Sequence, residues 1–115
     1  MIFHKQKDIV LVPFLFTDAS TKKRRPALIV SNDTINKNWE TPDFVALAIT
    51  SKIRRGSYGI QIGNDDLKKG SLPSKSEIQC DKIFTIEKSL VIKKLCTLND
   101  TVFSLVKSKL AEVFK

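Results

Sequence analysis

Short apolar runs separated by polar segments make up most of the chain, and this pattern is typical of a small β-protein. Runs rich in β-branched and aromatic residues, bounded by turn-forming residues, predict strands. The pattern predicts six strands, at residues 8–16, 26–31, 44–50, 58–62, 76–81 and 90–98. Pro13 cannot donate a ladder hydrogen bond, so it predicts an edge or a bulge in the first strand. Residues 17–23 and 32–42 are expected to be connections, and residues 84–86 a tight corner.

The tail of the chain changes to a helical period. Asn99 and Asp100 are candidate N-caps, and apolar residues follow them at helical spacing. These residues are Val102, Leu105, Val106, Leu110, Val113 and Phe114. We expect this stripe to pack on the chain's own strands, with a dimer interface as the alternative. The pattern as a whole predicts a mainly β fold, a small antiparallel barrel with a C-terminal α-helix, as one domain over residues 1–115.

The chain is basic, with 20 Lys plus Arg against 12 Asp plus Glu and a formal net charge of +8. Such a domain attracts polyanions, although composition alone leaves RNA, DNA, a membrane surface, an acidic protein or a merely solvated surface open. The longest apolar stretch, residues 9–16, is too short to span a bilayer, and no small-residue cleavage site follows it. We therefore expect a cytoplasmic protein that does not enter a membrane.

The histidine and cysteine content narrows the possible chemistry. His4 is the one histidine in the sequence, which excludes a His–His catalytic pair and argues against structural zinc. Cys80 and Cys96 have no CxxC partner, so we expect two reduced, partly buried thiols. No metal and no cofactor are expected.

Two basic clusters flank predicted strands: residues 22–25 precede the second strand, and Lys52, Arg54 and Arg55 follow the third. If those strands are neighbours, both loops open on one end of the barrel and form a positive groove. The alternative is two solvated loops.

Within these clusters, Arg25 and Thr50 are the candidates for chemistry. Pro26 holds the residue before it extended, and the Arg25 guanidinium has the planar fork that binds phosphate. Thr50 closes an apolar strand and is followed by Ser51 and Lys52, so hydroxyls and an ammonium group meet at a strand end. The alternative is that Thr50 is an ordinary strand residue.

Four segments in this order resemble the MazF/PemK toxins: KDIVLVPFLFTDAS, KRRPALIVSN, ALAITSK and IQCDKIFTIEKSLVIKKLCTL. The resemblance covers nearly the whole chain. It implies an SH3-like barrel of the CcdB/MazF type, a homodimer, and an endoribonuclease restrained by an antitoxin protein, with DNA contacted only through that antitoxin. It further implies metal-independent cleavage of single-stranded RNA at short sequences. The 2′-hydroxyl would attack, leaving 2′,3′-cyclic phosphate and 5′-hydroxyl ends.

The family's catalytic arginine falls on Arg25 and its catalytic threonine on Thr50, while Ser51 takes the place of a second hydroxyl near the RNA. The other expected RNA contacts are Lys23, Arg24, Lys52, Arg54 and Arg55. Two departures affect the RNA preference and the acid–base assignment. Several members carry a glutamate where this chain has residues 20–22, and others an arginine where it has Phe84. Asp18 and Asp81 are candidates for the missing carboxylate.

The sequence is also compatible with three other functional interpretations. One is a barrel that binds nucleic acid without cutting it, and another is a catalytically decayed family member. A third is a gyrase-poisoning toxin of the same fold, but that family ends in tryptophan and small apolar residues, whereas this chain ends in Glu-Val-Phe-Lys.

Overall fold

A computed structural model of the chain describes residues 3–14 and 23–115. Its strands are β1 (Asp8–Phe14), β2 (Lys23–Ile29), β3 (Asp43–Thr50), β4 (Gly59–Ile62), β5 (Leu67–Gly70), β6 (Ser76–Glu87) and β7 (Lys93–Leu98). Its helices are α1 (Asp33–Lys37) and α2 (Asp100–Val113), with 3₁₀ turns η1 (Asn64–Asp66) and η2 (Lys88–Leu90).

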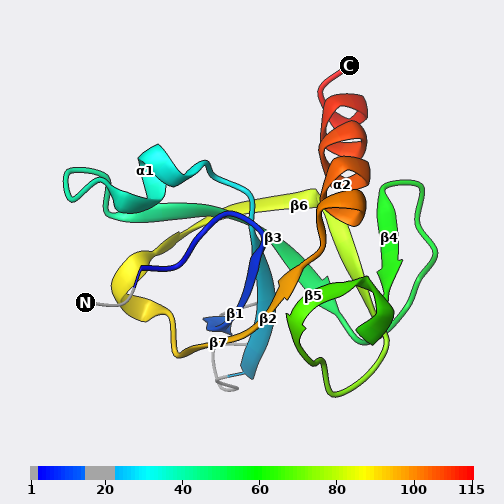
Figure 1. Cartoon of the computed structure of the whole chain (residues 1–115). Coiled ribbons are helices and arrows are strands. Elements are labelled where there is room, and N and C mark those ends of the chain that lie inside the picture. Colours follow the sequence, from blue (N-terminus) through cyan, green and yellow to red (C-terminus); the bar gives the residue numbers. More distant parts are fainter. Residues whose placement is uncertain (1–2, 15–22) are drawn as a thin grey trace.

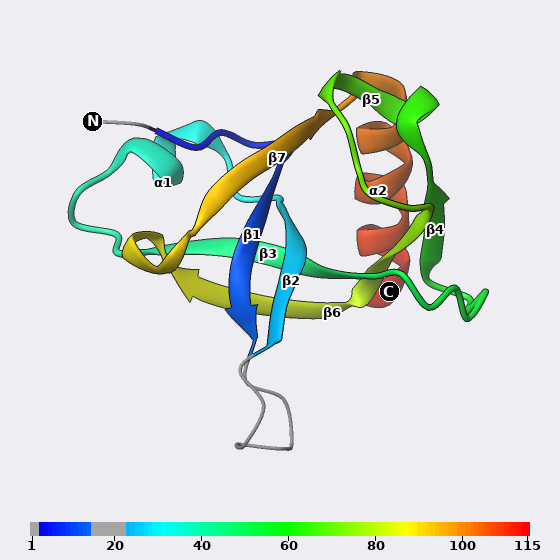
Figure 2. The same cartoon turned by 90° about the horizontal axis from the view of Figure 1, so that it is seen from below.

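The strands form one antiparallel sheet in the order β4-β6-β3-β2-β1-β7-β5. The sheet is strongly curled, so that its two edge strands, β4 and β5, both lie near α2 (Figures 1 and 2). α1 lies at the other end of the molecule, beside the start of β3. This arrangement confirms the predicted mainly β architecture with a C-terminal helix.

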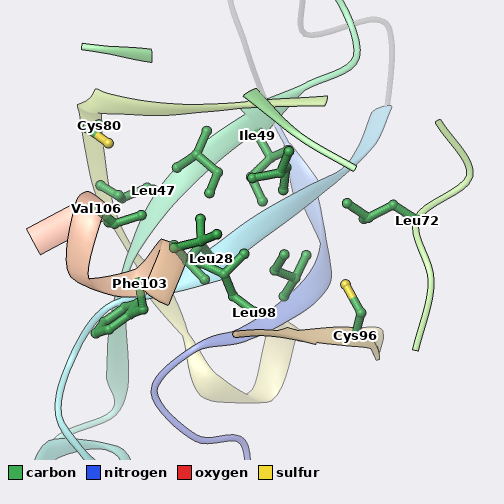
Figure 3. Close-up of a cluster of buried hydrophobic side chains, with 13 residues drawn as sticks. Leu28, Leu47, Ile49, Leu72, Cys80, Cys96, Leu98, Phe103 and Val106 are labelled. Atoms are coloured by element: carbon green, nitrogen blue, oxygen red, sulfur yellow. The ribbon is translucent and has the colours of Figure 1, made fainter. Parts of the chain in front are cut away.

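Side chains alternate between the two faces of the central strands, and each face contributes to its own hydrophobic cluster. Ile9, Leu28 and Leu47 belong to the cluster between the sheet and α2, where Phe103 and Val106 meet them (Figure 3). Their sequence neighbours, such as Val10 and Ala27, point to the other face and join a second cluster with Phe44. Both faces of these strands are buried, which explains why the sequence shows continuous apolar runs instead of a clean alternation.

α2 begins at the predicted cap and packs on the sheet, but two residues of the predicted stripe, Leu105 and Phe114, are exposed. The Asn99 side chain accepts a hydrogen bond from the backbone N–H of Val102 at 2.8 Å, which satisfies one of the free amides of the first turn. Val102 and Val106 are buried, whereas Leu105 is 54% exposed and Phe103 is buried in its place. The helix therefore packs on the chain's own sheet, with its apolar stripe displaced toward Phe103.

Several predicted boundaries were wrong. β2 begins at Lys23 instead of residue 26, and β7 begins at Lys93 instead of residue 90. Residues 84–86, predicted as a tight corner, are part of β6. The irregularity in β6 lies instead between Gln79 and Ile83, where a bulge shifts its register with β3. Residues 15–16, predicted as strand, and 17–22, predicted as loop, lie outside the described residues.

Two elements were missed, because α1 is too short to show a helical period and β5 has no apolar alternation. α1 is one helical turn, capped by the Asn32 side chain on the Ile35 N–H. β5 contains Lys68 and Lys69, and short, lysine-rich strands are common at sheet edges because they discourage pairing with other chains.

Pro13 and the cysteines lie as predicted. In its pairing with β7, β1 has a bulge between Ile9 and Val10. β7 pairs with Asp8 to Leu11, so Pro13 has no described strand partner on the β7 side of β1. Cys80 and Cys96 are free and buried, and burial raises the pKa of each thiol to about 11. Among the described helices, none is long and apolar enough to cross a membrane.

Candidate active site

The pairing of β2 with β3 brings the two candidate catalytic residues together. Ala27 pairs with Ala48, Leu28 with Leu47 and Ile29 with Ala46. The same register extended by two residues places Arg25 opposite Thr50. Arg25 also lies on the same face of β2 as Ala27, since side chains alternate along a strand.

A pocket of about 210 Å³ opens at this end of the two strands. It is lined by Arg25, Ala48, Ile49, Thr50, Lys52, Arg54, Gln79 and Lys82. Four cationic side chains and a hydroxyl thus surround one small cavity, which is the arrangement expected for binding a phosphate group.

Arg25 offers this pocket a hydrogen-bond donor. Its Nε atom is buried and has no partner among the described residues. Buried donors are nearly always paired in native proteins, so the Arg25 Nε is a donor that an acceptor such as a phosphate oxygen can satisfy.

Thr50 is 9% exposed, and its hydroxyl is oriented by the chain that follows it. Thr50 Oγ1 accepts a hydrogen bond from the Lys52 backbone N–H at 3.1 Å. Because this bond uses an oxygen lone pair, the hydroxyl proton stays available for donation. Thr50 can therefore donate to an oxygen of a ligand held by Arg25.

The other expected contacts divide into two groups. Lys52 and Arg54 line the pocket. Arg24, Ser51 and Arg55 are exposed and are not among its lining residues, and Arg24 points to the opposite face of β2 from Arg25. Lys23 begins β2, but its side chain lies outside the described part of the chain.

The structure describes one of the two candidate carboxylates, and it does not line this pocket. Asp18 lies outside the described residues, and Asp81 is exposed and absent from the pocket lining. A different carboxylate, Glu77, lies next to the site: it pairs directly with Thr50 across β3 and β6, and it is 2% exposed.

Three residues of β6 near the site were missed by the sequence analysis: Glu77, Gln79 and Lys82. Gln79 pairs with Ala48, and Lys82 lies in the bulged part of β6. No sequence signal identifies these three residues. They come close to Thr50 only because β6 pairs with β3, and the paired residues Thr50 and Glu77 are 27 positions apart in the sequence.

A larger cavity of about 490 Å³ lies at the other end of β3, lined by aromatic residues such as Phe3, Trp39 and Phe44 together with polar and charged residues that include Lys37, Glu87 and Lys88. Arginine is absent from its described lining residues. We place the chemistry in the smaller pocket, because only there do a guanidinium and an oriented hydroxyl meet.

The chain is similar in sequence to one protein family. The family model described as "PemK-like, MazF-like toxin of type II toxin-antitoxin system" matches residues 5–114. No curated protein sequence matches the chain significantly.

The fold is similar to that of several solved structures. A MazE–MazF complex from Deinococcus radiodurans has a TM-score of 0.80 at 19% identity, with 99% of this chain and 97% of that chain covered. An endoribonuclease with its cognate antitoxin from a mycobacterial species has a TM-score of 0.78 at 21% identity, with coverage of 96% and 94%. A mycobacterial endoribonuclease has a TM-score of 0.75 at 22% identity, with coverage of 99% and 93%. At these identities the likeness establishes the fold.

Proposed function

Because the chain belongs to the family of PemK-like, MazF-like toxins of type II toxin–antitoxin systems, we propose that it is a metal-independent endoribonuclease acting on single-stranded RNA. Two of the structural relatives bear the name endoribonuclease. The observation that carries the proposal is the placement of Arg25 and Thr50 on one pocket, with the Arg25 Nε buried and free of described partners.

The proposed reaction uses the nucleophile that RNA itself contains. The 2′-hydroxyl loses its proton to solvent as it attacks the adjacent phosphorus in line. The bond to the 5′-oxygen breaks and that oxygen takes up a proton from solvent, so the products are a 2′,3′-cyclic phosphate and a 5′-hydroxyl with no net change in protons. Negative charge gathers on the phosphoryl oxygens in the transition state, so fixed donors aimed at them accelerate the step.

Each catalytic residue then has a separate role. Arg25 binds the scissile phosphate and stabilises the transition-state charge. An arginine stays protonated in proteins, which suits it to this role and not to that of a base. The Thr50 hydroxyl, oriented by the Lys52 backbone N–H, donates a hydrogen bond to a phosphate oxygen.

The basic loop supplies positioning contacts. Lys52 and Arg54 line the pocket, Ser51 and Arg55 are exposed in the same loop, and Arg24 is exposed on the opposite face of β2 from Arg25. With Lys23 they are proposed to hold the flanking RNA backbone. Duplex RNA is excluded because in-line attack requires a splayed backbone and the bases of a duplex are already paired.

The proposed partners follow from the same charges. A cognate antitoxin would lay an acidic, partly disordered segment along the basic surface and exclude RNA by occupying the same cations. Two of the similar structures are toxin–antitoxin complexes. We propose a cytoplasmic homodimer consisting of one catalytic domain per chain, which contacts DNA only through its antitoxin.

The test is incubation of purified protein, free of antitoxin, with a long unstructured RNA in EDTA. We expect discrete fragments with 5′-hydroxyl ends from the wild type. Arg25→Ala and Thr50→Ala should each lower the cleavage rate by about 10²-fold or more, the usual loss for a transition-state donor, while Thr50→Ser retains the hydroxyl and most of the rate.

Three outcomes would contradict the proposal. A requirement for Mg²⁺, or 5′-phosphate ends, would reject the mechanism. Intact RNA with normal RNA binding would favour a binding module over an enzyme.

A further inference from the structure

Glu77 is a buried carboxylate beside the proposed active site. It pairs with Thr50 of β3 on one side and with Gln61 of β4 on the other. It is 2% exposed, and no described lysine or arginine forms an ion pair with it. A buried carboxylate needs hydrogen-bond donors to be tolerated, so the donors that it finds indicate its role.

The donor is the backbone of the basic loop, residues 51–58. Arg55 donates its backbone N–H to Glu77 Oε2 at 2.8 Å. Arg55 also has a φ of +53°, a left-handed conformation that is unfavourable for a residue with a Cβ and persists only where the surroundings hold it. The hydrogen bond to Glu77 is the described contact that holds Arg55 in this conformation.

Gly59 closes the other side of the same carboxylate. A Cβ added to Gly59 would lie 2.6 Å from Glu77 Cδ, so the carboxylate occupies the space that a side chain at this position would need. The loop therefore folds over Glu77, with the Arg55 amide and the bare Cα of Gly59 both against it.

The shape of this loop determines where the pocket cations lie. Lys52 and Arg54 line the pocket, and Arg54 immediately precedes the residue that Glu77 holds. The start of the loop is tied by Thr50 Oγ1. The end of the loop is tied by Lys109 Nζ, which donates to the Ser57 carbonyl at 3.1 Å. The hydrogen bond from the Arg55 N–H to Glu77 holds the loop between these two hydrogen bonds.

We propose that Glu77 is a positioning residue for RNA: its buried carboxylate fixes the backbone of Arg55 and thereby holds Lys52 and Arg54 at the pocket of Arg25 and Thr50. This inference rests on the proposed function where it predicts changes in kcat and KM. The predicted effect of Glu77 on RNA binding can be measured without cleavage.

Two substitutions test the role by different routes. Glu77→Ala removes the acceptor. Gly59→Ala removes no charged side chain but displaces the Glu77 carboxylate, and the φ of Gly59 does not lie in the left-handed region. Glu77→Gln keeps an acceptor oxygen and serves as the rescue. The matched controls are Glu87→Ala, an exposed acid at the far end of β6, and Gly63→Ala, whose added Cβ would meet nothing closer than 3.9 Å.

Two measurements are needed for each variant that shows a native thermal transition. The first is kcat and KM on an RNA oligonucleotide that the wild type cuts. The second is the salt dependence of binding to a fluorescein-labelled, fully 2′-O-methylated single-stranded RNA of mixed sequence, which lacks the attacking hydroxyl and cannot be cut.

We expect Glu77→Ala and Gly59→Ala to raise KM about tenfold and to make the salt slope shallower by about one to two, because one or two phosphate contacts are lost. Their kcat should stay within about threefold of wild type, since Arg25 and Thr50 keep their strand positions. Glu77→Gln and both controls should resemble the wild type.

A merely structural role gives a different result, namely a lower kcat from a smaller active fraction, with KM and salt slope unchanged. That result, or wild-type behaviour of both test variants, would overturn the inference. If the wild type fails to cut RNA, the proposed function fails, and the binding experiment still decides the role of Glu77.

Discussion

At the scale of the residue, the proposed role of Arg25 depends on its place on a rigid element. It pairs with Val12 of β1, and the register of β2 on β3 places it opposite Thr50. Catalytic groups on strands are held more precisely than groups on loops. The loop cations Lys52 and Arg54 need an additional anchor, which Glu77 supplies.

His4 makes a pH-dependent contribution to stability. Its Nδ1 is buried and has no partner among the described residues, and its ring packs edge-on against Phe44 with centroids 6.1 Å apart. Burial lowers the pKa of His4 below 6.5, with Lys94 adding to the effect and Asp8 opposing it.

A lowered pKa means that the unfolded chain takes up the proton more readily than the folded protein. The contribution of His4 is therefore fully present above the unfolded value of about 6.5 and is lost as pH falls below it toward the lower folded value. We expect the urea midpoint of the wild type to decrease from pH 7.5 to pH 5.5 by more than that of His4→Gln. Because the sequence contains no other histidine, parallel pH profiles for the two proteins would show the prediction to be wrong.

At the scale of the element, α2 completes the core that the curled sheet leaves open. Phe103 and Val106 cover the inner face of the sheet beside Leu28 and Leu47 (Figure 3). One stripe of the helix is therefore structural. Its outer face, with Leu105 and Phe114 exposed, is open to solvent in the single chain.

This orientation predicts unequal costs for two apolar truncations in α2. Phe103→Ala removes a buried ring and should lower the free energy of unfolding by about 3–5 kcal/mol. Leu105→Ala should change it by no more than about 0.5 kcal/mol, since its side chain is 54% exposed. Urea unfolding of both variants at low protein concentration is the measurement. Similar losses would mean that α2 packs in a different rotation or that Leu105 is covered by a second copy, and dilution distinguishes these two cases.

At the scale of the whole molecule, charge is distributed unevenly along the fold. The formal net charge is +8, and one end of β3 carries the pocket with four cations, while the other end carries the larger cavity, whose described charged lining residues are Lys37, Glu87 and Lys88. If the chain binds RNA as proposed, long-range attraction by the net charge concentrates RNA near the protein. The local cations would then determine where along the surface it binds.

Neutralising a pocket cation should therefore have a different effect from neutralising a distant one. We expect Arg54→Gln to weaken binding of uncleavable single-stranded RNA for all sequences and to make the salt slope shallower by about one. Lys37→Gln in α1, which lies at the opposite end of the molecule (Figure 1), should leave the slope unchanged. Equal effects of the two substitutions would show that only net charge matters, and a change confined to sequence preference would assign Arg54 to base contacts.

The sequence by itself determined the features that depend on local pattern. Apolar runs located the central strands, and the change of period after Asn99 located α2 with its cap. The order of segments pointed to the family and, within it, to Arg25 and Thr50 as the candidate pair. The predictions of strands, helix and family are confirmed, because strand and helix periods and caps are properties of neighbouring residues, whereas the roles of Arg25 and Thr50 stay predictions. α1 was missed because five residues contain less than two helical periods, and β5 because its residues Leu-Lys-Lys-Gly show no apolar alternation.

Only the tertiary structure decided which segments meet. The pairing of β3 with β6 placed Glu77 beside Thr50 and brought Gln79 and Lys82 to the pocket, while strand alternation turned Arg24 away from it. The left-handed Arg55 and the fit of Gly59 over Glu77 likewise depend on contacts between segments far apart in the chain. Strand register and the packing of a loop over a buried charge are set by the free energy of the whole fold, and no local spacing records them.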